Sequence, residues 1–114
     1  MKNVLLVEDE AIIRFDILLQ LESMGFNVFA TAYAEESIEI AKKEDIHLVI
    51  MDVMLAGEMD GIEAAKIISS YNIPIIFCTA RPVNSINDQN LPFEYAILKK
   101  PFNKEELEYI LRNF

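Results

Sequence analysis

Five short, mainly apolar runs divide the chain, and a longer segment of mixed polarity follows each of them. The runs occupy residues 3–7, 27–31, 48–52, 74–78 and 95–98. Continuous apolar runs of about five residues are typical of strands that are buried on both faces, as in a parallel sheet. The third run passes directly from Met51 into Asp52, so we expect an aspartate at the carboxyl end of a central strand.

The segments between the runs carry the apolar spacing of helices. We expect helices over residues 11–24, 34–43 and about 60–71, and a last helix that begins at residue 103. Asp60 and Asn103 are each followed three positions later by a glutamate, which is the spacing of a capping box. The repeated alternation of strand and helix predicts an α/β fold, in which a parallel sheet carries helices on both faces.

The helix expected at residues 11–24 is apolar on almost every side. Positions 11, 15, 18 and 19 predict the face that turns inward, while Ile13, Ile17 and Leu21 lie partly off that face. We expect a broad contact with the core here in preference to an interaction surface. Gly25 is suited to end the helix.

The segment from Arg81 to Phe93 is the weakest part of the chain for regular structure. It contains Pro82 and Pro92 together with three asparagines. Proline cannot donate a backbone hydrogen bond, and asparagine competes with the helical backbone for hydrogen bonds. Any helix in this segment is therefore expected to be short and poorly favoured.

The composition narrows the classes of function. With 114 residues the chain has the size of one domain, which we expect to span residues 1–114. A formal net charge of −9 argues against binding to nucleic acid or to an anionic membrane surface, because both attract clustered lysine and arginine. The single cysteine, Cys78, excludes an internal disulfide, and the first apolar run is too short for a signal peptide or a membrane span. We therefore expect a cytoplasmic protein.

Polar side chains stand at the ends of four predicted strands: Glu8 and Asp9, Asp52, Thr79 and Lys100. In parallel sheets these ends lie along one edge, where ligands bind. Carboxylates that lie close together repel, and a divalent cation that prefers oxygen ligands, such as Mg²⁺, would relieve the repulsion. With Mg²⁺ and Lys100 to neutralise a transferring phosphoryl group, Asp52 is suited to be the nucleophile that accepts it. A lone aspartate at a strand end is more often only a cap, so this prediction depends on the whole set.

Through these residues the sequence resembles the receiver domain of two-component response regulators, over essentially its whole length. The resemblance is carried by Glu8-Asp9, Asp52, Met59-Asp60-Gly61, Thr79-Ala80 and Lys100-Pro101-Phe102, in the expected order and at the expected strand ends. It implies a flavodoxin-like fold, a doubly wound parallel sheet of five strands in the order 2-1-3-4-5 with helices on both faces.

The resemblance also implies a chemistry and its partners. Asp52 would accept a phosphoryl group from a histidine kinase, from a histidine phosphotransfer protein or from a small acyl phosphate. Mg²⁺ would be held by Asp9, Asp52 and the backbone carbonyl of Met54, with Glu8 acting largely through water. The phosphorylated domain would then signal to a downstream protein that the sequence does not identify.

The remaining implications concern the other end of the site. Thr79 and Lys100 would contact the phosphoryl oxygens, and the Lys100–Pro101 peptide would be cis, a form that only proline tolerates well. Apart from accepting the phosphoryl group and slowly hydrolysing its own aspartyl phosphate, the domain would not be an enzyme.

Some positions depart from the family pattern. The family has an aromatic residue three positions before the lysine, whereas this chain has Ile97 there and an aromatic residue nearby at Tyr95. Whether Thr79 is coupled to an aromatic residue in the usual way therefore stays open. The positions that affect phosphoryl lifetime hold Met54, which could shield the phosphoryl group from water, and Arg81, which could pair with it or lie in solvent.

Three other functions remain open. The domain could be a receiver that no longer switches and serves as a docking module or as the interface of a homodimer, through its apolar first helix or its altered fourth helix. A phosphatase with Asp52 as a turnover nucleophile would need a second acid two positions later, where Met54 stands. Flavin binding would need a phosphate-cradling loop after the first strand, where Glu8, Asp9 and Glu10 have the wrong charge.

Overall fold

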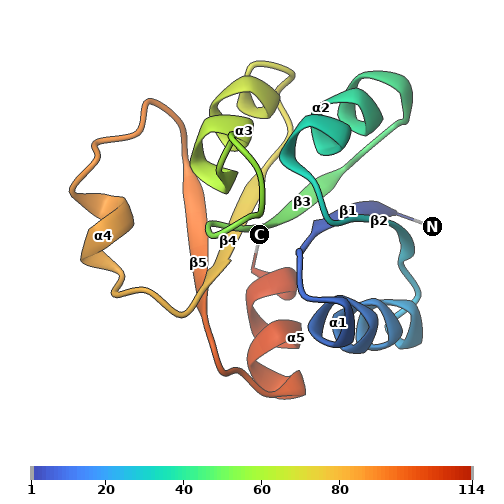
Figure 1. Ribbon diagram of the computed structural model, residues 1–114. Helices are drawn as coiled ribbons and strands as arrows, with labels where there is room; N and C mark the ends of the chain where they lie inside the picture. Colours follow the sequence, from blue (N-terminus) through green and yellow to red (C-terminus); the bar gives the residue numbers. More distant parts are fainter. Residues whose placement is uncertain (1, 114) are drawn as a thin grey trace.

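A parallel sheet of five strands forms the centre of the molecule, and helices cover both of its faces (Figure 1). The computed structural model describes residues 2–113. The strands are β1 (Asn3–Val7), β2 (Asn27–Thr31), β3 (Leu48–Asp52), β4 (Ile75–Thr79) and β5 (Tyr95–Lys99). The helices are α1 (Ala11–Ser23), α2 (Ala34–Lys43), α3 (Gly61–Ser69), α4 (Asn84–Asn87) and α5 (Lys104–Arg112). Each predicted strand is present, and its ends lie within about one residue of the expected bounds.

The strands pair in the order β2-β1-β3-β4-β5, and every pairing is parallel. The predicted α/β fold and the strand order 2-1-3-4-5 are therefore confirmed. β1, β3 and β4 are almost entirely buried, because neighbouring strands flank them and helices cover both faces. This double burial explains why their sequences are apolar without interruption. Since all strands run in the same direction, their carboxyl ends lie along one edge of the sheet.

The helices form one layer on each face of the sheet (Figure 1). α1 and α5 pack on one face, where Ile17 and Leu107 are buried. α2, α3 and α4 cover the other face through residues such as Ile38, Ile68 and Ile86. Burying each such side chain contributes roughly 1.5–3 kcal/mol of transfer free energy. Between residues 2 and 113, no helix is both long enough and apolar enough to span a membrane.

α1 presents a different side to the sheet from the one that its spacing predicted. The predicted inner face is wrong, because Phe15 and Leu19 are 58% and 48% exposed. Ile17 and Leu21 are buried in the core instead, and Ile12 is 87% exposed. A helix that is apolar on nearly every side has no inner face defined by sequence, so its contacts with the sheet decide which side is buried. Part of α1 is therefore an exposed apolar surface, which was not the favoured expectation.

α3 and α5 begin at the capping boxes that the sequence predicted. The Asp60 carboxylate accepts a hydrogen bond of 2.9 Å from the backbone N–H of Glu63, and Asn103 accepts one of 2.8 Å from Glu106. Each glutamate side chain in turn accepts a bond from the backbone of its capping residue. These reciprocal bonds satisfy amides that the first helical turn leaves free, and they fix where each helix begins.

α4 is a helix of four residues, as the weak helix-forming sequence of this segment predicted. The fully buried side chain of Ile86 anchors it in the core. A second anchor comes from β5, where the Tyr95 hydroxyl donates a hydrogen bond of 2.5 Å to Asn87 Oδ1. With so few contacts, α4 depends on its neighbours for its position more than on its own helical propensity.

Gly61 allows α3 to start directly against the end of β3. A Cβ at this position would lie 1.9 Å from the backbone oxygen of Asp52. The Gly61 N–H donates to the carbonyl of Val53 at 3.0 Å. Only glycine permits so close an approach of two backbones. The start of α3 thus supports the stretch of main chain that carries Asp52.

Gly61→Ala is expected to lower the free energy of unfolding by about 3 kcal/mol, because the main chain of Asp52 must move to admit the methyl group. Gly57→Ala is the matched control, since Gly57 has a φ of +100° and open space around its Cα. Backbone strain alone should cost that variant about 1–2 kcal/mol. Urea unfolding followed by circular dichroism gives both values, and equal losses would contradict the steric role of Gly61.

Candidate functional site

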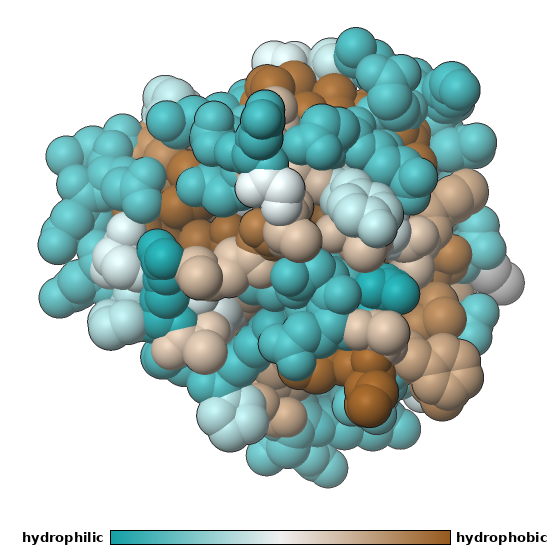
Figure 2. All heavy atoms as spheres, in the orientation of Figure 1, coloured by the Kyte–Doolittle hydropathy of each residue, from teal (hydrophilic) through white to brown (hydrophobic). Residues whose placement is uncertain are grey.

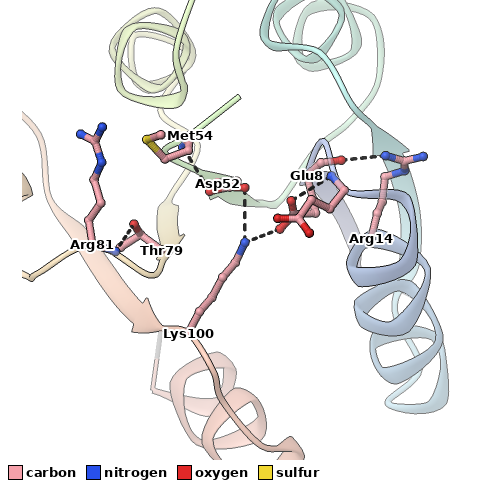
Figure 3. Close-up of polar contacts among 8 residues, drawn as sticks. Glu8, Arg14, Asp52, Met54, Thr79, Arg81 and Lys100 are labelled. Carbon is pink, nitrogen blue, oxygen red and sulfur yellow. Dashed lines mark hydrogen bonds and ion pairs between the residues drawn. The ribbon is translucent and has the colours of Figure 1, made fainter. Parts of the chain in front are cut away.

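The carboxyl edge of the sheet brings together ionisable side chains from several strands (Figure 3). Glu8 follows β1, Asp52 ends β3 and Lys100 follows β5. Lys100 Nζ lies 2.5 Å from Glu8 Oε1 and 3.3 Å from Asp52 Oδ2. The ammonium therefore bridges two carboxylates that belong to different strands.

Asp9 completes an acidic cluster with these two carboxylates. One oxygen from each of Glu8, Asp9 and Asp52 lies within 4.8 Å of the others. Glu8 and Asp52 are only 1% and 5% exposed, whereas Asp9 is half-buried. The Lys100 ammonium contacts only Glu8 and Asp52, so negative charge is in excess in this cluster of three carboxylates. Hard oxygen donors at this spacing fit a divalent cation such as Mg²⁺.

Backbone groups and one arginine hold the carboxylates and the loop that carries them. Glu8 Oε2 accepts a bond of 3.1 Å from the N–H of Glu10, and Asp52 Oδ1 accepts one of 3.1 Å from Met54. Arg14 Nη1 donates to the backbone carbonyl of Glu8 at 2.8 Å. The sequence pattern did not point to Arg14, whose only signal is that it is a basic residue about one helical turn after Glu10.

Burial and the shared ammonium give the two inner carboxyl groups opposite pKa shifts. Burial, together with the neighbouring Glu8 carboxylate, raises the pKa of Asp52 to about 7 against the opposing effect of Lys100. Burial also acts to raise the pKa of Glu8, but the hydrogen bond from Lys100 and other bonds to its carboxylate lower the pKa below its usual value. Burial acts to lower the pKa of Lys100, yet its bond to Glu8 and the charge of Asp52 raise it. Below about pH 7 in the absence of a cation, the pair therefore carries a proton, held mainly on Asp52.

Thr79 is buried at the end of β4. Its hydroxyl accepts a hydrogen bond of 3.0 Å from the backbone N–H of Arg81. Within residues 2–113, no hydrogen bond joins this hydroxyl to Asp52 or Lys100, although all three lie at the same edge (Figure 3). The Arg81 side chain is exposed and its guanidinium points away from Lys100.

The ends of β4 and β5 are tied together beside the site. The Lys100 N–H donates to the Thr79 carbonyl at 2.8 Å, and the Lys99 ammonium donates to the carbonyl of Ala80. These two bonds hold the main chain at the end of β5, from which the Lys100 side chain extends towards Asp52. The Lys100–Pro101 peptide is cis, as the resemblance implied.

An open cleft of about 870 Å³ lies beside the acidic cluster. Its polar side includes Asp52 and Lys100, and its apolar rim includes Ile12, Met54 and Phe102. The Met54 side chain is 53% exposed at this rim. The site thus combines charged groups with apolar surface that another molecule can contact.

β5 carries its aromatic residue at Tyr95, two positions before Ile97. Both side chains pack against the core layer beneath α2, α3 and α4. The Tyr95 ring stands edge-on to Phe77 and Phe93, with centroid distances of 5.4 and 6.0 Å. Since its hydroxyl binds Asn87, the aromatic contact between β5 and α4 comes from Tyr95 and not from the position that is aromatic in the family.

Comparison with known proteins agrees with this fold. Residues 4–112 match the family model of the response regulator receiver domain. The chain belongs to this family. Receiver domains are the signalling domains of two-component systems, so the resemblance inferred from the sequence is confirmed.

The receiver domain has relatives of known sequence and structure. It is 37% identical to the transcriptional regulatory protein YvrH of Bacillus subtilis over 115 aligned residues. This alignment covers 96% of this chain and 47% of YvrH. The chemotaxis protein CheY4 of Vibrio cholerae shares 27% identity and a TM-score of 0.89, over 99% of this chain and 98% of that one. The receiver domain of the sensor histidine kinase PA1611 from Pseudomonas aeruginosa, solved with a magnesium ion coordinated in its active site cleft, shares 28% identity and a TM-score of 0.85, over 98% of this chain and 95% of that one. The chain spans about half the length of the first relatives of known sequence that it matches.

Asp52→Asn is expected to stabilise the receiver domain at pH 8 in the absence of divalent cations. Because the pKa of Asp52 is raised in the fold, its contribution to stability is largest at low pH and is lost as the pH rises through about 7. Asparagine occupies the same space without the charge, so the variant should gain on the order of 2 kcal/mol at pH 8 and little near pH 4. Urea titrations in a chelating buffer measure both differences.

Asp88→Asn serves as the control, since Asp88 is an exposed aspartate that follows α4 and lies outside both the acidic cluster and the cleft. Its stability relative to the wild type should not follow this pH dependence. An Asp52→Asn variant that is less stable than the wild type at pH 8 would contradict the electrostatic description of the site.

Proposed function

We propose that this receiver domain is a phospho-accepting switch, phosphorylated on Asp52 in a magnesium-dependent way. The observation that carries the proposal is the bridge made by Lys100, whose ammonium lies 2.5 Å from Glu8 Oε1 and 3.3 Å from Asp52 Oδ2 beside an open cleft. Transfer of a phosphoryl group to a carboxylate needs a fixed positive charge next to the nucleophile and access for the donor. The site provides both.

Asp52 acts as the nucleophile. One of its oxygens attacks the phosphorus of a phosphohistidine, the P–N bond breaks, and the electron pair of that bond stays on the imidazole nitrogen. The ammonium of Lys100 pairs with an oxygen of the incoming phosphoryl group, while its contact with Glu8 keeps it at the edge of the sheet. Since the pKa of Asp52 is about 7, a bound cation would favour the ionised form that attacks.

Asp9, Asp52 and the backbone carbonyl of Met54 would hold Mg²⁺, which supplies positive charge against the carboxylates and the phosphoryl oxygens. Glu8 is expected to act through water. Both of its carboxylate oxygens already have partners, Oε1 in Lys100 and Oε2 in the amide of Glu10. The magnesium ion in the cleft of the PA1611 receiver domain supports this assignment.

Thr79 would bind a phosphoryl oxygen through its hydroxyl. That hydroxyl accepts a hydrogen bond from Arg81, so its own proton remains free to be donated. A movement of the hydroxyl towards the phosphoryl group would pull on the backbone that leads into α4. This provides a physical route from the chemistry at Asp52 to the outer surface of the domain.

The phosphodonor would be a histidine kinase or a histidine phosphotransfer protein, and a small acyl phosphate would replace it in vitro. The apolar rim of the cleft includes Ile12, and Phe15 and Leu19 extend the exposed apolar surface along α1. Figure 2 shows this hydrophobic surface at the lower right of the view, over α1. An apolar surface beside the nucleophile suits a partner that presents its phosphohistidine on an amphipathic helix. A second protein would read the phosphorylated state.

Incubation with acetyl phosphate and Mg²⁺ is expected to add one phosphoryl group, about 80 Da, which intact-protein mass spectrometry detects. Asp52→Asn should abolish the adduct because it removes the nucleophile. Lys100→Met should slow its formation by a factor of about 100 or more, since removal of a single positioned electrostatic group commonly costs that much.

Asp88→Asn is the matched control and should be phosphorylated like the wild type, because Asp88 is exposed and lies outside both the acidic cluster and the cleft. Absence of any adduct in the wild type, or the same adduct in Asp52→Asn, would contradict the proposal.

A receiver that no longer switches and serves for docking or dimerisation is the second candidate. The observations that favour it are Ile97 at the position where the family has an aromatic residue, and the reduction of α4 to four residues. Tyr95 argues against this second candidate, because its hydroxyl donates a hydrogen bond that connects β5 to α4.

Beryllofluoride, a phosphoryl mimic, is expected to shift the backbone amide NMR signals of Asn84–Asn87 as well as those around Asp52. Tyr95→Phe, which lacks the hydroxyl bonded to Asn87, should reduce the shifts in α4 and leave those around Asp52 unchanged. The signals of α2 provide an internal control, since α2 packs on β1 and β2, and β2 is the edge strand farthest from β5. If α4 does not respond while Asp52 does, the second candidate is favoured, and sedimentation analysis then tests for a homodimer.

A further inference from the structure

The start of α1 lacks the side-chain cap that begins α3 and α5. Glu10 occupies the capping position, and its side chain makes no capping hydrogen bond. The first turn of α1 also has no acidic residue. The loop Glu8–Glu10, which carries two of the three clustered carboxylates, is therefore held by other contacts.

Contacts with the rest of the molecule engage every polar group of Glu8. Its N–H donates to the carbonyl of Thr31 at 3.0 Å. Its carboxylate oxygens accept from Lys100 and from the amide of Glu10. Its carbonyl accepts from Arg14 Nη1 at 2.8 Å, and Arg14 is itself fixed by a helical bond of 2.8 Å from its N–H to the carbonyl of Glu10.

The bond from Arg14 acts on the peptide that leads into Asp9. The Glu8 carbonyl and the Asp9 N–H belong to one planar peptide unit, so fixing the first also fixes the second. Asp9 is the least buried of the three clustered carboxylates, so packing restrains it least when the three repel one another. Figure 3 shows Arg14 reaching from α1 to this peptide.

We propose that Arg14 is a positioning residue for the divalent cation, because its hydrogen bond to the Glu8 carbonyl holds Asp9 where the Asp9 carboxylate can bind the metal. This inference rests on the proposed function, since it requires that Asp9 and Asp52 bind Mg²⁺. It gives the arginine a role in metal affinity in addition to any role in the stability of α1.

The positive charge of Arg14 allows its positioning role to be distinguished from its electrostatic effect on a bound cation. A guanidinium near the acidic cluster repels a second cation, so its removal would by charge alone tighten Mg²⁺ binding. Loss of a hydrogen bond that orients a metal ligand weakens binding instead, by about 10-fold or more. The direction of the change therefore distinguishes the two effects.

The test is a Mg²⁺ titration of the full chain, followed by calorimetry and by the backbone amide NMR signals of residues 8–10 and 52–54. Arg14→Met removes the donors but keeps most of the aliphatic stem, and it is expected to weaken Mg²⁺ binding about 10-fold. Arg14→Lys keeps the charge and one donor group and should recover part of the affinity. Arg112→Ala removes the same charge from an exposed site on α5 and should leave the affinity unchanged.

A weaker affinity in Arg14→Met, together with a native amide spectrum, supports the positioning role. An affinity equal to or tighter than that of the wild type overturns this role and leaves the proposed function standing. A wild type that binds no Mg²⁺ overturns both. If Arg14→Met does not fold, Arg14→Ala is compared with Arg14→Lys in its place, and wild-type affinity in Arg14→Ala overturns the role.

Discussion

Lys100 joins two carboxylates that a protein interior would not otherwise hold together. Glu8 and Asp52 are almost completely buried, and transfer of an unpaired charge from water to a buried position costs several kcal/mol. One ammonium can compensate the charge of only one carboxylate. Because the second carboxylate is buried without full compensation, the pKa of Asp52 is raised to about 7. The same deficit of positive charge makes this edge of the sheet suited to a divalent cation and to a reaction that is assisted by cations. The stability of the domain and its chemistry are thus linked through a single side chain.

The parallel sheet makes this cluster possible. Its strands deliver Glu8, Asp52, Thr79 and Lys100 to one edge, although these residues are spread over most of the chain. Tight backbone contacts then set their positions. Gly61 lets α3 press against the main chain of Asp52, the Thr79 carbonyl binds the amide of Lys100, and Arg14 binds the carbonyl of Glu8. A site of this kind needs neighbours that are rigid on the scale of a hydrogen bond, because electrostatic energies change steeply with distance.

Two peripheral helices give the domain its individual features. α1 leaves Ile12, Phe15 and Leu19 exposed, and Ile12 lines the cleft beside the acidic cluster. α4 lies on the opposite layer and is held by one buried isoleucine and one hydrogen bond from β5. A short helix with so few anchors can change its position at low cost, and Tyr95 is the aromatic residue of β5 that contacts it. The exposed apolar side of α1 and the short helix α4 are therefore separated by the sheet.

The sequence alone determined the strands, the two capping boxes, the strand order implied by the family and the residues that meet at the acidic edge. These features depend on local patterns or on the ends of parallel strands, which a sequence displays directly. It did not determine which side of α1 is buried, because an apolar helix offers several equivalent faces. Nor did it reveal that the Arg14 guanidinium binds a carbonyl, that Tyr95 binds α4 or that the pKa of Asp52 is near 7. Each of these depends on distances between residues that only the packed tertiary structure brings together.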